Sequence, residues 1–203
     1  MSRKIFDILT SAGGVAVVIV LVIAGGLLTW GHNFVNSNVH DQLAQQQISF
    51  PPAAAFAHAK AGTEITPSMI PTVSQYAGQQ MLTGQQAKVY ANNFIAVHLS
   101  EMPYGGVYSK VSAAAMAAPK NTQLSALKLT SFQGTTLRGL LLEAYAFSTV
   151  GSIMMWGAIA SFILAAFIAV LVGLGIWHAR RVTEDVSLLS GKSAPAAPAA
   201  PAV

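Results

Sequence analysis

Two long apolar stretches without charged side chains dominate the pattern along the chain. No Asp, Glu, Lys or Arg occurs at positions 8–40 or at positions 144–179. Each stretch exceeds the roughly 20 apolar residues that a helix needs to cross the hydrocarbon core of a bilayer. Neither stretch shows the alternation of a strand, and a backbone in lipid must satisfy its hydrogen bonds internally. We therefore expect two transmembrane helices, at residues 8–30 and 153–177.

The ends of both stretches support membrane spans. Trp156 and Trp177 are separated by about 31 Å of helix at 1.5 Å per residue. That length matches the hydrocarbon core and puts an indole at each interface. For the first stretch, the alternative is a signal peptide with a cleavage site at Val35–Ser37. Its apolar run is longer than the 7 to 15 residues usual in signal peptides, which favours an uncleaved anchor.

Basic residues beside the spans predict the orientation. Arg3 and Lys4 precede the first span, and Arg180 and Arg181 follow the second. Lys and Arg in short flanking segments mark the cytoplasmic side of a membrane. We therefore expect both termini in the cytoplasm and the central part of the chain outside. The expected segments are a cytoplasmic N-terminus at 1–7, an exoplasmic domain at 31–152 and a cytoplasmic tail at 178–203.

The segment between the spans is long enough for one small domain. Apolar residues recur every four positions from Val35 to Leu43, which predicts that the first span continues outward as a helix. The doubled proline at 51–52 lacks two amide donors and disfavours helix at the residue before it. We expect the helix to end by Phe50.

The strongest helix signal outside the spans begins at Thr83. Thr83 and Gln86 fit a capping box, in which each side chain accepts a hydrogen bond from the backbone amide of the other residue. Apolar residues at helical spacing follow as far as Met102, and Pro103 ends the pattern. Residues 57–81 contain several Gly and Pro and predict a loop with one helical turn.

Further helices are expected at residues 107–118 and 122–132, and from Thr136 through the second span to Arg181. The fold class is therefore all-α, with two transmembrane helices flanking a small exoplasmic helical domain. The tail is rich in Pro and Ala and has no apolar periodicity, which predicts disorder.

Composition agrees with a membrane protein. Hydrophobic residues make up 53% of the chain and charged residues only 9%, whereas about 25% of an ordinary soluble domain is charged. Cysteine is absent, so the exposed domain folds without disulfides. The formal net charge of +4 is small and scattered, which does not indicate a nucleic-acid partner.

Five pieces of the central segment, in order, carry a resemblance to known proteins: DQLAQQQISFPPA (Asp41–Ala53), QYAGQQM (Gln75–Met81), QAKVYANNFIAVHL (Gln86–Leu99), GGVYSKVSAAAMAAP (Gly105–Pro119) and FQGTTLRGLLLEAYAFSTVG (Phe132–Gly151). With these pieces, the chain resembles an uncharacterised actinobacterial family of two-span membrane proteins. Members of that family often carry the label aromatic ring-opening dioxygenase, LigA-like. The resemblance implies the two-span architecture and an actinobacterial source, and it carries over no catalytic residue.

The stretch FIAVHLSEM contains two residues of metal-ligand types, His98 and Glu101, whose spacing of three would let them share a metal from one helix face. A ring-opening dioxygenase with non-haem iron needs two histidines and a carboxylate around the metal. The other histidines outside the spans, His32, His40 and His58, lack a matching spacing. We favour the interpretation that His98 is a half-buried residue of an amphipathic helix and that Glu101 faces solvent. No catalytic, cofactor-binding or metal-binding residue is expected, and neither is a cofactor.

Small residues recur every fourth position in the second span, at Gly157, Ser161, Ala165, Ala169 and Gly173. Such a ladder lets another helix approach closely. The other helix is either the first span of the same hairpin, or a second copy of the chain or another membrane subunit. The ladder is the candidate helix-packing interface.

The leading functional hypothesis is a non-catalytic integral membrane protein that serves as a scaffold or accessory subunit of a cell-membrane assembly. Respiratory complexes are one candidate partner, on architecture alone. Its expected partners are the lipid bilayer and either a membrane protein or a second copy. The first alternative is an exoplasmic lipid or small-ligand binding module, which a pocket of suitable size would favour. The second is a metal-dependent ring-opening dioxygenase, which bound iron would favour.

Overall fold

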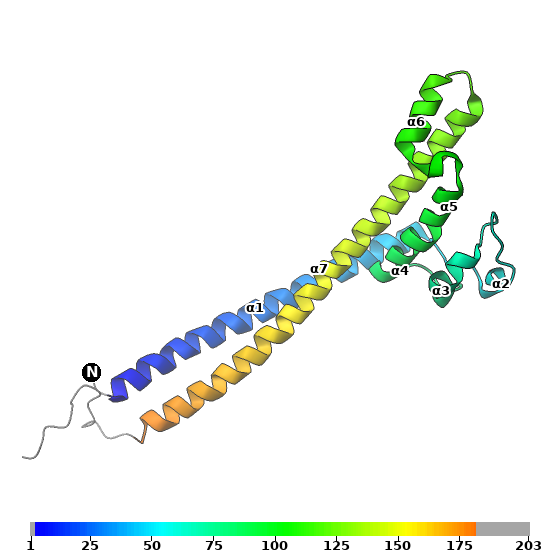
Figure 1. Cartoon of the computed structure of the whole chain (residues 1–203). Helices are drawn as coiled ribbons and strands as arrows, with labels where there is room; N and C mark the ends of the chain where they lie inside the picture. The colour runs from blue at the N-terminus through cyan, green and yellow to red at the C-terminus, as the bar shows by residue number, and fades with distance from the viewer. Residues whose placement is uncertain (1–2, 182–203) are drawn as a thin grey trace, which may run out of the picture. The chain divides into compact units, whose positions relative to one another are not determined.

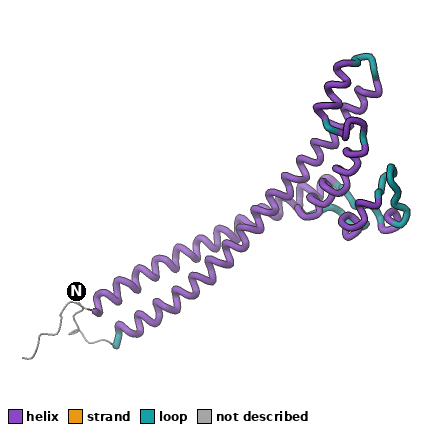
Figure 2. The backbone as a smooth tube through the Cα atoms, viewed as in Figure 1, coloured by secondary structure: helices purple, strands orange, loops and turns teal. Residues whose placement is uncertain are grey.

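The computed structural model describes residues 3–181 and is all-α apart from one isolated β-bridge, between Ser49 and Gln80. Two long helices, α1 (Arg3–Gln46) and α7 (Thr122–Ala179), pack together, and the small helices lie between them in the sequence (Figure 1). Figure 2 shows that helix dominates the described backbone. The predicted disordered tail lies outside the described residues from position 182 onward.

Both long helices are long and apolar enough to cross a membrane. Only 6% of the most apolar window of each helix is buried within the chain. The core helix of a soluble protein would bury most of such a stretch. The apolar side chains of α1 and α7 are instead largely exposed, as lipid-facing side chains would be.

The first helix continues beyond the predicted span, as the spacing of Val35, Val39 and Leu43 predicts. It ends at Gln46, four residues before Phe50. Gln47 has a φ of 53°, which turns the backbone out of the helix. The Phe50 amide then donates to the Gln79 carbonyl at 2.8 Å, so the chain after α1 pairs with the segment that precedes the capping box.

The elements between α1 and α7 are short. Residues 57–81, predicted as a loop with one helical turn, contain three consecutive turns of helix rather than one. The elements are α2 (Ala53–Phe56), η1 (Pro67–Met69), α3 (Ile70–Val73), η2 (Ser74–Tyr76), α4 (Gly84–Tyr90), η3 (Ala91–Ile95, a π-helix), α5 (Ala96–Glu101), η4 (Pro103–Gly106) and α6 (Tyr108–Ala117).

The predicted capping box is confirmed. The Thr83 hydroxyl accepts from the Gln86 amide at 3.2 Å, and the Gln86 side-chain carbonyl accepts from the Thr83 amide at 3.0 Å. The Leu82 amide donates to the same Gln86 oxygen at 2.8 Å. Three amide groups at this end of α4 are therefore satisfied, which fixes where the helix starts.

The predicted break between residues 132 and 136 is wrong, because α7 runs without interruption from Thr122 to Ala179. Gly134 lies between these two predicted helices. In the structure its missing side chain leaves room for Leu99, whose Cδ2 would lie 2.8 Å from a Cβ at this position. Packing of α5 against α7 therefore explains this glycine, rather than a change in backbone direction.

The chain divides into two compact units. The hairpin unit comprises Met1–Leu28 and Gly157–Val203, and the helical unit comprises Thr29–Trp156. Each long helix contributes residues to both. The core of the helical unit brings together residues from α1, η1, α3, α4, η3 and α7 and from the segments that connect them: Val39, Leu43, Phe50, Met69, Val73, Met81, Ala87, Ala91 and Leu141 are all buried. Burial of a large apolar side chain contributes about 1.5–3 kcal/mol.

Contacts in the hairpin unit follow a seam with alternating steps of three and four residues along α7. The more buried positions are Ala158, Ser161, Ala165, Ile168, Val172, Gly175 and Ala179. Small residues on one helix face the side chains of the other: Leu28 lies 3.3 Å from where a Cβ on Gly157 would be, and Ser11 Oγ lies 3.0 Å from one on Gly175. This spacing is that of a left-handed coiled coil.

Candidate functional site

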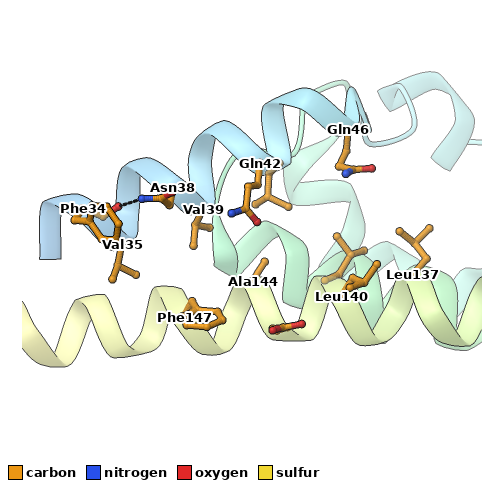
Figure 3. Close-up of a pocket in the computed structure, with 13 residues that line it drawn as sticks. Phe34, Val35, Asn38, Val39, Gln42, Gln46, Leu137, Leu140, Ala144 and Phe147 are labelled. Carbon is orange, nitrogen blue, oxygen red and sulfur yellow. Dashed lines mark hydrogen bonds between the residues drawn. The ribbon is translucent and has the colours of Figure 1, made fainter. Parts of the chain in front are cut away.

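A groove of about 420 Å³ lies between α1 and α7 within the helical unit (Figure 3). Its size is within the range of small-molecule pockets, roughly 300–1,000 Å³. Both of its long sides are helices, so the groove is elongated along the two helix axes. Its lining consists of Phe34, Val35, Asn38, Val39, Gln42, Leu43 and Gln46 from α1, and Leu137, Leu140, Leu141, Glu143, Ala144 and Phe147 from α7.

The floor of the groove is part of the core, and its walls are exposed. Val39, Leu43 and Leu141 are buried and belong to the core of the helical unit. The walls carry large apolar side chains in contact with solvent in the isolated chain, since Leu140 is 58% exposed and Phe147 is 52% exposed. Exposed apolar side chains around a concave surface are typical of a binding site.

Polar groups are confined to one row on α1 and one residue on α7. Asn38, Gln42 and Gln46 follow one another at intervals of four residues, so their amides form a row along one face of the helix. Figure 3 shows Gln42 lying over the groove opposite α7. Glu143 is the one charged residue among those that the structure places around the groove. The lining can therefore hold an apolar body and accept or donate hydrogen bonds along one edge.

Close helix contacts define the end of the groove that is nearer the predicted spans. His32 Nδ1 and the Gly151 carbonyl oxygen form a hydrogen bond of 2.8 Å. Since a carbonyl oxygen can only accept, the His32 nitrogen is the donor. Val35 also packs on Gly151, 3.4 Å from where its Cβ would be, and Met154 packs on Gly31. Beyond these contacts the exposed walls begin.

The structure places His98 and Glu101 in the last turn of α5, with different exposure to solvent. His98 is half-buried, its Nδ1 donates to the Phe94 carbonyl oxygen at 2.9 Å, and its ring lies edge-on to Phe94. Glu101 is exposed at the end of α5. Within residues 3–181, no three side chains of His, Cys, Asp or Glu lie together in a way that could hold a metal ion.

His98 instead ends a row of five aromatic rings, Tyr76, Phe50, Tyr90, Phe94 and His98, with centroids 4.5–5.3 Å apart. Helical spacing alone placed three of these rings on one face, whereas Phe50 and Tyr76 come from other segments. Burial, and secondarily the nearby Glu64 carboxylate, raises the pKa of Tyr90, so its hydroxyl stays protonated at neutral pH. The row is a packing feature of the core.

The structure separates the five residues of the predicted small-residue ladder. Ala165 is only 4% exposed and lies in the seam with α1, and Gly157 and Ser161 are half-buried near it. Ala169 and Gly173 are exposed. Each step of four residues turns about 40° around a helix of 3.6 residues per turn, so the ladder gradually leaves the seam. Whether its exposed part contacts a partner stays a prediction.

Sequence reasoning missed the groove. The amide row of Asn38, Gln42 and Gln46 was a visible signal, because amides at intervals of four residues share one helix face. The apolar wall on α7 carried no comparable signal, since Leu137, Leu140 and Phe147 are ordinary residues for an apolar helix. Only the packing of α1 beside α7 brings the two sets together.

The chain matches no protein-family model, no curated protein and no solved structure. Its resemblance to the actinobacterial two-span family therefore stays a prediction.

Proposed function

We propose that this protein is a non-catalytic, two-span membrane protein that holds its helical unit on the exoplasmic side and serves as a scaffold or accessory subunit of a cell-membrane assembly. The observation that carries the proposal is the exposure of the apolar side chains on α1 and α7. Two helices with such faces would be insoluble as a free hairpin in water and are stable in lipid.

The exposed end of the ladder supports a role in assembly. Ala169, with only a methyl group, and Gly173, without a side chain, are exposed on the hairpin unit. Helices in lipid associate through small residues that allow close backbone contact. Large side chains such as Phe167 and Leu171 occupy other exposed faces of the same helix, so the small-residue face is the one on which another transmembrane helix can approach closely.

Topology is tested with single cysteines, because the natural chain has none. A cysteine at Ser74 should react with a membrane-impermeant thiol reagent in intact cells, and a cysteine at Ser190 should react only after the cells are opened. The reason is the excess of Arg and Lys beside the termini. Labelling of Ser190→Cys alone in intact cells would mean the opposite orientation.

The assembly is tested by extraction in mild detergent and identification of the proteins that co-purify. Ala169→Leu should reduce the recovery of a genuine partner at least severalfold, because a branched side chain would separate the two helices. Ala160→Leu is the matched control, since Ala160 is also exposed and projects from the opposite face of α7. Leucine is favourable in lipid, so both variants should insert normally.

Two outcomes would contradict the assembly role. One is that wild-type protein inserts in the membrane and purifies without any stoichiometric partner or second copy. The other is an equal loss of partner in the two leucine variants, which would show that the Ala169 face is not the contact. The first outcome would favour the alternative function, an exoplasmic binding module, which the groove between α1 and α7 supports.

A further inference from the structure

We propose that the groove between α1 and α7 holds the hydrocarbon chain of a membrane lipid whose head group carries a primary ammonium. The inference rests on the proposed membrane location and goes beyond the scaffold role, because it assigns a ligand to a specific surface of the helical unit. It is carried by the shape of the groove, by its position beside the predicted spans and by its polar groups.

The size of the groove favours a small ligand over a protein. Thirteen residues line a volume of about 420 Å³, whereas a stable protein interface usually involves about 20–30 residues on each side. The groove is nevertheless long, because Phe34 and Gln46 are separated by about 18 Å of helix at 1.5 Å per residue.

The position of the groove favours a ligand that comes from the bilayer. The first lining residue, Phe34, stacks on Trp30, with ring centroids 5.6 Å apart. Trp30 is 67% exposed and lies at the end of the predicted first span. Tryptophan at such a position marks the membrane interface. The apolar wall therefore begins one helical turn from the interface, and a hydrocarbon chain can enter it without crossing a polar surface.

The polar groups select the head of the lipid. Glu143 is exposed on the α7 side, and the amides of Asn38, Gln42 and Gln46 lie along the α1 side. A carboxylate attracts an ammonium group, because unlike charges within about 4–6 Å stabilise one another. It repels an anionic head group, because like charges destabilise one another. The amide oxygens offer further acceptors for the ammonium hydrogens. Phosphatidylethanolamine supplies both the chain and the ammonium, and phosphatidylglycerol supplies the chain without it.

The test uses full-length protein in vesicles of phosphatidylcholine that contain phosphatidylethanolamine with a photoactivatable diazirine in one acyl chain. After irradiation, mass spectrometry locates the lipid on the protein. We expect labelled residues to concentrate in 34–46 and 137–147, above the uniform background along the two spans. Phosphatidylglycerol with the same diazirine should label these ranges at least fivefold less.

Two pairs of variants make the test specific. Ala144→Phe fills the groove and should lower its labelling at least fivefold, whereas Ala146→Phe places the same side chain on the same helix outside the groove. Ala144 also packs against the core, so Ala144→Phe could disturb the fold. Leu140→Gln is therefore the second groove variant, because it replaces an apolar side chain of the groove wall at an exposed position. Glu143→Gln should reduce the preference for phosphatidylethanolamine over phosphatidylglycerol while keeping the label in the groove.

Each possible result supports or overturns the inference. Uniform labelling of α1 and α7, or equal labelling of the groove in Ala144→Phe, Leu140→Gln and Ala146→Phe, would overturn it. So would a polypeptide cross-linked to a photoreactive residue at position 140 in cells, which would identify the occupant as a protein. Failure of the membrane proposal looks different, because the protein would then be released from vesicles by an alkaline carbonate wash.

Discussion

Alanine at Gly106 should disrupt the turn that joins α5 to α6, whereas alanine at the neighbouring Gly105 should destabilise the turn much less. The two glycines have almost the same φ, 63° and 64°. They differ in their surroundings: a Cβ on Gly105 would meet no atom within 4 Å, whereas one on Gly106 would overlap the Leu99 carbonyl and lie 2.8 Å from its carbon. The Leu99 carbonyl is backbone, so it cannot move aside as a side chain can.

The expected difference in unfolding free energy follows from these contacts. Alanine at a left-handed position costs about 1–2 kcal/mol, and both variants incur that loss. Gly106→Ala adds the cost of forcing atoms into a packed site, about 1–3 kcal/mol. It also displaces the Gly106 carbonyl oxygen, which accepts from the buried Ser131 hydroxyl at 2.6 Å. Loss of that bond would detach the turn from α7.

Hydrogen exchange followed by mass spectrometry measures this effect in purified protein. Amides of residues 96–117 should exchange at least tenfold faster in Gly106→Ala than in Gly105→Ala, because local opening depends exponentially on local stability. Peptides from 5–28 should exchange equally in both variants and serve as an internal control. Equal protection of 96–117 in the two variants would show that the turn does not sit against Leu99.

A disulfide between positions 11 and 175 should form almost completely, and one between positions 11 and 173 should not form. Ser11 Oγ lies 3.0 Å from the position of a Cβ on Gly175, whereas a Cβ on Gly173 would meet no atom within 4 Å. A disulfide requires its two Cβ atoms to be about 3.5–4.5 Å apart. Positions 173 and 175 differ by about 200° around the helix, so they face opposite directions.

The cross-link is measured in purified Ser11→Cys/Gly175→Cys protein after mild oxidation. A protease site introduced at the exposed segment around Gly62 allows the chain to be cut between α1 and α7. The two fragments should remain joined in a non-reducing gel and separate with reductant. The Ser11→Cys/Gly173→Cys control should give separate fragments with and without reductant. Joined fragments from both variants, oxidised at low protein concentration, would contradict the seam.

The small-residue ladder shows where a sequence pattern and a packed structure differ. An interval of four residues and a seam of alternating three and four residues coincide for about two turns and then separate. Ala165 satisfies both, and its burial follows from the seam. Gly173 fits only the interval of four residues, and it is exposed. No rule of spacing along α7 alone could decide between them, because the choice depends on the helix that packs against it.

Features that depend only on neighbouring residues could be predicted before the structure was known. These are the two apolar helices, the capping box at Thr83, the helix that ends before Pro103 and the separate helix that ends before Pro119. They were predictable because hydrophobic period, proline and caps act within about one helical turn. Three features became visible only in the folded chain: α7 continues through Gly134, Gly106 lies on Leu99, and a row of amides on α1 faces an apolar wall on α7. The period of a helix fixes which residues share a face, but the face that another element covers depends on contacts between residues far apart in the chain.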